Sequence, residues 1–338
     1  MPTFAFILFK MNPTPPFDIQ ALWSLSENDF QEKAIQLYQW QVEYNEVYNR
    51  WANLSGSFSP RPTTVCDIPF LPISFFKTHN VLIGEKPKSF FESSGTTQDV
   101  VSKHWVVSTE VYEQSFNHGF ELFYGNPSAY CIIGLLPSYL ERQHSSLVYM
   151  VEHLINQSGH PQSGFYLYEF ETLNKVLANL EKQGQKTILI GVSFALMDFA
   201  EAFPQRLKHT IVIETGGMKG RKTEMIKPVL HDFLKQSLGT DQIHSEYGMT
   251  ELFSQAYAQK NGLFKCPPWM KVLVGEEEDP SNIKSSGRGL LHVIDLANVY
   301  SCAFIETQDL VELYEDGSFK VLGRSDNSDR RGCSLLVV

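Results

Sequence analysis

The feature that most constrains the fold is a regular alternation of apolar, strand-like segments with amphipathic, helix-like segments from about residue 129 onward. Strands are expected at 129–137, 164–168, 186–192 and 209–217. Helices are expected after them, at 144–155, 171–183, 195–203 and 222–238. Parallel strands need long crossover connections, and helices supply them. The alternation therefore predicts an α/β fold with a mostly parallel sheet flanked by helices.

The regions on either side have a different character. Residues 27–53 carry apolar side chains at helical spacing after Ser26, a candidate cap, so one helix is expected there. Residues 287–296, 301–324 and 332–338 are expected strands, and Asp316-Gly317 predicts a hairpin turn. We expect a helical segment at 1–65, an α/β body at 66–255 and a β-rich subdomain of the same domain at 256–338.

Composition excludes several classes of protein. A net charge of −10 argues against non-specific nucleic-acid binding, which requires a basic face. The five cysteines are scattered and lack CxxC spacing, which disfavours a zinc site or a disulfide framework and fits a reducing compartment. The apolar run Phe4–Phe9 is too short to span a membrane, and Met11 is a second candidate start. We expect a cytoplasmic protein without a membrane span.

A hydroxyl-rich turn, Ser93-Ser94-Gly95-Thr96-Thr97, follows two phenylalanines. Backbone N–H and side-chain O–H donors in such a turn can wrap an anion. The turn is not a P-loop of the GxxxxGK[ST] type, and Ser/Gly/Thr turns are common. Taken alone, it is a weak indication of phosphate binding.

A second polar cluster spans 245–251, where Tyr247 offers a flat ring to a purine and Thr250 a hydroxyl to a phosphate. Glu251 offers a carboxylate to Mg²⁺, which prefers one or two carboxylates together with substrate phosphates. The alternative for Glu251 is a residue in the first turn of a helix, where a carboxylate interacts well with the helix dipole.

Two further charged residues lie in the strand-rich region. Asp309 interrupts a segment that should be apolar, and its carboxylate can accept hydrogen bonds from ribose hydroxyls. An edge-strand or turn aspartate is the alternative. Arg324 follows the expected hairpin and can contact a ribose or a phosphate.

The order of these clusters resembles the adenylate-forming superfamily of acyl-CoA synthetases. The fold this resemblance implies is the large domain of those enzymes, without their small C-terminal domain and its lysine. It also implies ATP and Mg²⁺ as cofactors, with Glu251 at the metal and Thr250 in catalysis. The nucleotide-binding residues that it implies are Ser93, Ser94, Gly95, Thr96, Thr97, Gly216, Gly217, Tyr247, Asp309 and Arg324.

Within that superfamily, the segments "IPFLPISFFKTH", "FFESSGTT" and "RRGCSLL" resemble the LuxE-type acyl-protein synthetases. The resemblance implies that a fatty or other carboxylic acid is activated as an acyl-adenylate and then carried on Cys333. The next acceptor would be a reductase subunit, an acyl carrier protein or CoA. A lone cysteine in a strand-like segment is more often a buried structural residue. The sequence departs from the superfamily in having "TQD" where "TGD" is usual.

Two alternatives remain open. One is an acyl- or aryl-CoA ligase related to phenylacetate-CoA ligase. The other is a serine acyl-hydrolase or acyltransferase, because Gly191-Val192-Ser193-Phe194-Ala195 lies between a strand and a helix, as a nucleophile elbow does. Nothing in the sequence selects its histidine or acid. His144 is a candidate near the substrate carboxylate, and a surface histidine at a helix start is the alternative.

Overall fold

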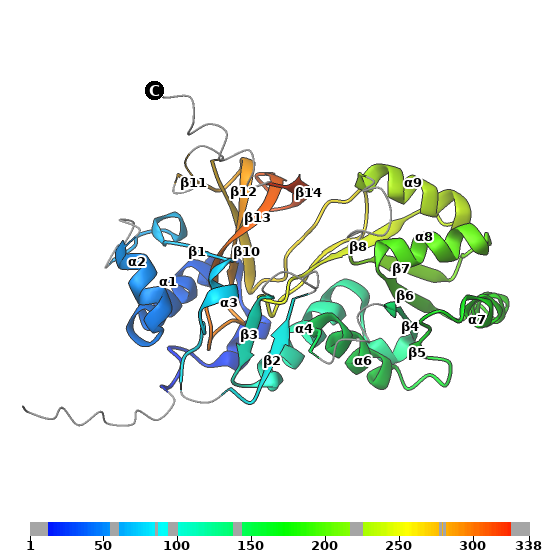
Figure 1. Ribbon diagram of the computed structural model, residues 1–338, viewed down its shortest axis with the longest axis horizontal. Coiled ribbons are helices and arrows are strands. Elements are labelled where there is room, and N and C mark those ends of the chain that lie inside the picture. The colour runs from blue at the N-terminus through cyan, green and yellow to red at the C-terminus, as the bar shows by residue number, and fades with distance from the viewer. Residues whose placement is uncertain are drawn as a thin grey trace, which may run out of the picture.

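The computed structural model describes residues 13–54, 61–84, 87–93, 101–137, 144–216, 226–276, 279 and 282–325. Figure 1 shows two sheets, each with its own helices, on either side of a short hairpin. Buried apolar side chains from both parts form one continuous core cluster. Among the described residues, none of the helices combines the length and apolar character needed to cross a membrane.

The right-hand part of Figure 1 is the predicted α/β layer structure. Its sheet has the order β5-β4-β6-β7-β8-β9, with all pairs parallel except β8 and β9. The strands are β4 (Cys131–Leu135), β5 (Gly164–Phe165), β6 (Thr187–Gly191), β7 (Thr210–Glu214), β8 (Ile243–Tyr247) and β9 (Ala256–Ala258). β4 and β6 are buried along their whole length, as their uninterrupted apolar sequences predict.

Helices cover both faces of this sheet. In Figure 1, α8 (Ser193–Ala202) and α9 (Lys227–Leu238) lie together on one side, with α4 (Thr109–Tyr124) and α6 (Ser146–Ser158) on the other. α7 (Phe170–Gln183) lies at the end of the layer and stops at Gly184, which has the positive φ of a helix C-cap. The expected strand–helix alternation is confirmed.

The left-hand sheet contains most of the β-rich segment. Its strands are β1 (Leu71–Pro72), β10 (Met270–Gly275), β11 (Ile283–Lys284), β12 (Gly287–Asp295), β13 (Phe304–Leu313) and β14 (Phe319–Arg324). β10, β12, β13 and β14 pair in antiparallel fashion, whereas β1 pairs in parallel with β13. The expected hairpin at Asp316-Gly317 joins β13 to β14, and Gly317 has a positive φ of 78°.

The expected helix over 27–53 is two helices, α1 (Glu27–Tyr44) and α2 (Glu46–Leu54). Asn45 separates them in an extended conformation. Its amide donates to the carbonyl of Ser301 at 2.7 Å, and its side-chain oxygen accepts from the N–H of Tyr48 at 3.0 Å. The prediction of one helix is wrong here because apolar spacing carries no information about a hydrogen bond to the segment between β12 and β13, more than 250 residues away.

Short elements complete the fold. They are η1 (Ile19–Ser24), η2 (Val65–Asp67), α3 (Phe75–Thr78), β2 (Ser89–Glu92), β3 (Lys103–Val106) and η3 (Pro127–Ala129). β2 and β3 form the hairpin that lies between the two larger parts in Figure 1.

The expected boundaries at residues 65 and 255 remain a prediction. β1 joins the C-terminal sheet, and β9, which begins at Ala256, joins the α/β sheet.

Candidate functional site

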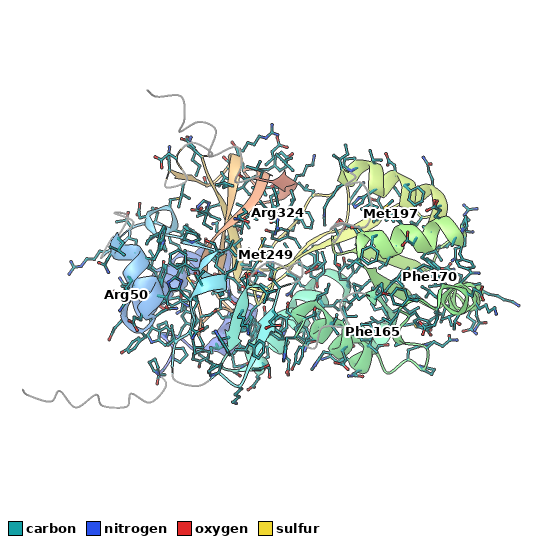
Figure 2. The ribbon with its side chains drawn as sticks, in the orientation of Figure 1. Arg50, Phe165, Phe170, Met197, Met249 and Arg324 are labelled. Atoms are coloured by element: carbon teal, nitrogen blue, oxygen red, sulfur yellow. The ribbon has the colours of Figure 1, made fainter. Side chains whose placement is uncertain are left out.

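The residues expected to bind a nucleotide meet where β8 ends beside β13 and β14. Tyr247 is the last residue of β8, and its hydroxyl donates to Oδ2 of Asp309 at 2.8 Å. Arg324 lies opposite Asp309 in the β13–β14 pair, and its Nε donates to Oδ1 at 3.1 Å. Figure 2 labels Arg324 and Met249, which mark this region between the two sheets. The structure thus brings together three residues that the sequence analysis took from three separate motifs.

Asp309 is held in position by its surroundings. Its own backbone N–H donates to the hydroxyl of Thr307 at 3.1 Å, and only 6% of the residue is exposed. Burial, followed by the nearby Asp309 carboxylate, raises the pKa of Tyr247 well above its ordinary value, so the phenol stays protonated and donates. Two donors use only part of the carboxylate's capacity for hydrogen bonds. Asp309 can therefore accept further bonds from a ligand hydroxyl.

The hydroxyl-rich segment lies between β2 and β3 in the chain. Ser93 and Ser102 close its base, because the Ser93 N–H donates to the Ser102 carbonyl at 3.1 Å and the Ser102 N–H donates to the Ser93 hydroxyl at 3.0 Å. Ser94, Gly95, Thr96 and Thr97 lie outside the described residues. The closed base nevertheless fixes the point at which this segment leaves and rejoins the hairpin.

That base is tied directly to the loop after β8. The Ser102 side chain hydrogen-bonds the Glu251 carboxyl. His104, on β3, lies 2.9 Å from the Thr250 carbonyl through Nδ1 and 2.8 Å from the Ser301 hydroxyl through Nε2. A carbonyl only accepts, so Nδ1 carries the proton and Nε2 accepts from Ser301. Burial lowers the pKa of His104 to about 4, which keeps it in this neutral form.

Glu251 has the chemistry expected of a magnesium ligand. It is 5% exposed, and burial raises its pKa, while the Ser102 hydrogen bond and the charges of Arg324 and Lys77 act in the opposite direction. A divalent cation would offset the cost of burying the ionised form. In the described part of the chain, no three or more metal-binding side chains gather in one place. One carboxylate combined with ligand phosphates is a usual donor set for Mg²⁺.

Lysines gather beside the hairpin base. A cavity of about 380 Å³ is bounded by α3 and the start of β3, and Lys77 and Lys103 both line it. Lys103 also pairs with Glu92 at 3.1 Å. Lys77 lies within the recognised "IPFLPISFFKTH" segment, but nothing in that segment indicates a role for its charge. The charge of Lys77 acts on Glu251, so positive charge is available next to the expected phosphate site.

Gly216 occupies a firmly held turn after β7, with a φ of 74° that favours glycine. Its N–H donates to Oε2 of Glu214 at 2.9 Å, and its carbonyl accepts from the Ser193 N–H at 2.8 Å. Gly217 lies outside the described residues.

Burial alone would raise the pKa of Glu214, but the Lys227 ammonium at 2.7 Å and hydrogen bonds from His231, Lys227 and Ser245 outweigh it and hold the pKa well below its ordinary range.

Of the two remaining catalytic candidates, the structure describes His144 but not Cys333. The His144 carbonyl accepts from the Glu92 N–H at 2.8 Å, and its ring packs on Phe90 with 4.1 Å between centroids. His144 is therefore next to the hairpin base, and its contact with a substrate carboxylate remains a prediction. Cys333 lies outside the described residues.

The strand–turn–helix context of Ser193 is present, since β6 ends at Gly191 and α8 begins at Ser193. The hydroxyl, however, donates to Oε2 of Glu214 at 3.2 Å, and the residue is 2% exposed. Among the described residues, no histidine forms a hydrogen bond with Ser193. Its only side-chain partner in the described residues is thus a carboxylate already held by Lys227 and Ser245, and the serine–histidine pair of a nucleophile elbow is not formed there.

No protein-family model matches the sequence, and no curated protein matches it. Solved structures do share its fold. ATP-bound MatB from Rhodopseudomonas palustris is 17% identical, with a TM-score of 0.52, over 70% of this chain and 47% of that one. The long-chain-fatty-acid-CoA ligase FadD1 from Archaeoglobus fulgidus is 14% identical, with a TM-score of 0.51, over 73% and 53%.

A third similar structure is the O-succinylbenzoate coenzyme A synthetase MenE from Bacillus subtilis with ATP and magnesium. It is 16% identical, with a TM-score of 0.50, over 72% of this chain and 51% of that one. The chain spans about half the length of the solved structures it matches. The predicted α/β fold is confirmed, because these solved structures share it over 70–73% of this chain.

Proposed function

We propose that this chain is an ATP-dependent, AMP-forming carboxylate ligase that activates a carboxylic acid as an acyl-adenylate. The observation that carries this is the Tyr247–Asp309–Arg324 cluster, which lies beside a hairpin base bonded to Glu251. A carboxylate with spare acceptor capacity suits ribose hydroxyls, and a turn rich in N–H and O–H donors suits phosphates. Both features lie on a fold shared with MatB and MenE structures that contain ATP.

The first step is attack by a substrate carboxylate oxygen on the α-phosphorus of ATP. A new P–O bond forms, the bond to the bridging oxygen of the β-phosphate breaks, and pyrophosphate leaves. The chain's contribution is positioning and electrostatics, with the 93–97 turn on the phosphates and Asp309 on the ribose. When bound, Mg²⁺ supplies charge neutralisation at the triphosphate, and Glu251 would hold it.

The second step transfers the acyl group to a thiol. We propose Cys333 as that thiol, as the LuxE-type resemblance implies, with a reductase subunit, a carrier protein or CoA as a later acceptor. Direct transfer to CoA is the alternative. FadD1, named as a fatty-acid-CoA ligase, and MenE, named as a coenzyme A synthetase, share the fold and so favour the ligase class without choosing between these acceptors.

The test of the proposed function is pyrophosphate release from ATP, measured over a panel of carboxylic acids with and without Mg²⁺. Release should require both ATP and an acid. The double variant Thr96→Ala with Thr97→Ala should lower it about tenfold or more, since each hydrogen bond lost to a charged group costs about 1.5–3 kcal/mol. Undiminished release by a folded double variant would remove the phosphate role from the 93–97 turn.

Ser193→Ala separates the ligase from the hydrolase. The variant loses one hydrogen bond to Glu214, a carboxylate that keeps Lys227, Ser245 and Gly216 as donors. ATP-dependent pyrophosphate release should therefore fall by no more than about tenfold, which corresponds to roughly 1.4 kcal/mol. Nitrophenyl-ester cleavage that needs no ATP and disappears in this variant would instead favour the serine hydrolase.

A further inference from the structure

One buried carboxyl next to the candidate site has no role in the proposed chemistry. Glu246 precedes Tyr247 in β8, and its side chain points to the opposite face of the strand from those of Ser245 and Tyr247. In the β8–β9 pair it lies directly opposite Tyr257. It is 8% exposed, yet within the described parts of the chain it forms no hydrogen bond or ion pair.

The surroundings of Glu246 offer hydroxyl and amide groups. Its charge acts on Tyr112 and Tyr124 of α4 and on Tyr257 of β9. Oε1 of Gln255 is also buried and has no hydrogen-bond partner. Glu246 and Gln255 both reach Gly248, since a Cβ built at residue 248 would collide with Oε1 of Glu246 and lie 3.4 Å from Cγ of Gln255. The Glu246 carboxyl and the Gln255 side chain, whose Oε1 lacks a partner, therefore converge behind the Tyr247–Glu251 loop.

Burying polar groups without hydrogen-bond partners costs folding free energy. A buried polar group without a partner loses its hydration and gains nothing in return. Burial, followed by the charge of Glu214, raises the pKa of Glu246 to about 8. At neutral pH the carboxyl therefore carries its proton, so it can both donate and accept a hydrogen bond. A ligand group that paired with it would recover the cost of burial.

The contacts on the face of β8 that carries Glu246 lead to the hairpin base rather than to the Asp309 cluster. The Asp309 cluster and Glu246 lie on opposite faces of β8. Tyr112, close to Glu246, donates its hydroxyl to the Ser146 carbonyl at 3.0 Å. Ser146 begins α6 two residues after His144, whose carbonyl accepts from the Glu92 N–H at the hairpin base. These contacts therefore connect Glu246 with the hairpin base, near which the proposed function puts the substrate carboxylate.

We propose that Glu246, with Gln255 beside it, forms the polar end of the substrate pocket and selects carboxylic acids that carry a hydroxyl or amino group. This inference rests on the proposed ligase function and names its substrate class. A plain alkyl chain would leave both side chains unpaired. Sites with buried polar groups reject analogues that cannot pair with them far more strongly than apolar pockets reject an added hydroxyl.

The kinetic test compares straight-chain acids with hydroxy and amino acids of the same length, substituted at successive positions, in the pyrophosphate-release assay. Wild type should prefer the best substituted acid by about tenfold or more in kcat/KM. Glu246→Leu should abolish or reverse that preference, and Glu246→Gln should retain it for hydroxy acids. Glu121→Leu, at an exposed position on α4, is the matched control and should leave the preference unchanged. An unchanged preference in active Glu246→Leu overturns the proposal.

A second measurement does not depend on catalysis. Thermal unfolding of the ATP-free protein is recorded with each acid, and substituted acids should raise the Tm of wild type more than alkyl acids do, but not that of Glu246→Leu. If no acid releases pyrophosphate, the proposed function fails, and these shifts still decide the role of Glu246. The proposal is overturned when no acid shifts the Tm, or when alkyl acids shift it as much as substituted ones.

The pH dependence of unfolding tests whether the buried Glu246 carboxyl is protonated at neutral pH. The pKa of Glu246 is raised on folding, so between about pH 4.5 and 8 the folded state holds a proton that the unfolded state has lost. The stability of wild type should therefore fall, relative to Glu246→Gln, as pH rises through this range. A constant difference means that Glu246 is ionised and paired, and overturns the proposal. The titratable or charged groups near it are Tyr112, Tyr124, Glu214, Lys227 and Tyr257.

Discussion

Asp309→Ala is expected to lower kcat/KM for ATP about a hundredfold or more, mainly by raising KM. The variant removes the acceptor of the Tyr247 hydroxyl and of the Arg324 guanidinium, and also the oxygens proposed to receive the ribose. Each hydrogen bond to a charged group is worth about 1.5–3 kcal/mol, and every 1.4 kcal/mol is a factor of ten. Tyr247→Phe removes only one donor and should cost about tenfold. Pyrophosphate release measured against ATP concentration gives both values.

Asp232→Ala is the matched control for this prediction. Its carboxylate is exposed on α9 and pairs with Lys235 at 2.7 Å, away from the Asp309 cluster. Exposed pairs of this kind contribute about 0–1 kcal/mol, so the ATP kinetics should not change. Circular dichroism and thermal unfolding establish that Asp309→Ala is folded. An unchanged KM for ATP in that folded variant would mean that Asp309 serves only to join β13 to β14.

The parts of the site that were predictable from sequence are those in which several functional residues sit within a few positions of one another. Tyr247, Thr250 and Glu251 lie in the one segment 245–251, and Asp309 is conspicuous because a strand interior should be apolar. Strand–helix alternation was equally predictable, since each element has its own periodicity. The antiparallel hairpin at Asp316-Gly317 followed from turn chemistry alone.

The residues that hold these motifs in place were not predictable. His104 binds the Thr250 carbonyl across 146 residues of sequence, and nothing local to His104 indicates that partner. Asp295 accepts the N–H groups of Phe253 and Ser254, and so fixes the loop after Glu251, from the end of a different strand. Such contacts depend on how the two sheets meet. A single sequence records the residue types but not the pairing.

The same limit applies to the substrate. The resemblance to acyl-protein synthetases led to the expectation of a fatty or other carboxylic acid. The motifs that carry this resemblance do not specify the chemical groups on the acyl chain. Glu246 stands within the recognised "SEYGMTE" segment, but strand alternation directs it to the face opposite Tyr247. Its burial and its lack of a partner among the described residues become apparent only when α4 and β9 are in place.

Cys333→Ser is expected to remove a covalent acyl label while leaving pyrophosphate release near the wild-type level. In the proposed transfer, the thiolate attacks the acyl carbonyl, a C–S bond forms, and AMP leaves as the C–O bond to its phosphate breaks. Adenylation precedes this step, so it should survive the substitution. Incubation with Mg²⁺, ATP and a labelled acid should label the wild-type protein at the C-terminal peptide. Neutral hydroxylamine should release the label, as it does from a thioester.

The four other cysteines provide the controls. Burial raises the pKa of Cys266 and Cys302 to about 12, and it also raises the pKa of Cys66 and Cys131, so all four are mainly protonated at neutral pH. Thiols are poor nucleophiles compared with thiolates, and because Arg330 and Arg331 precede Cys333 in the sequence, we expect their charge to favour its thiolate. Cys66 is half-buried, whereas Cys131 and Cys302 are buried, so Cys66→Ser is a suitable control and should keep the label. Labelling of Cys333→Ser equal to wild type, or a label that maps to one of these four cysteines, would rule out Cys333 as the carrier and favour direct transfer to CoA.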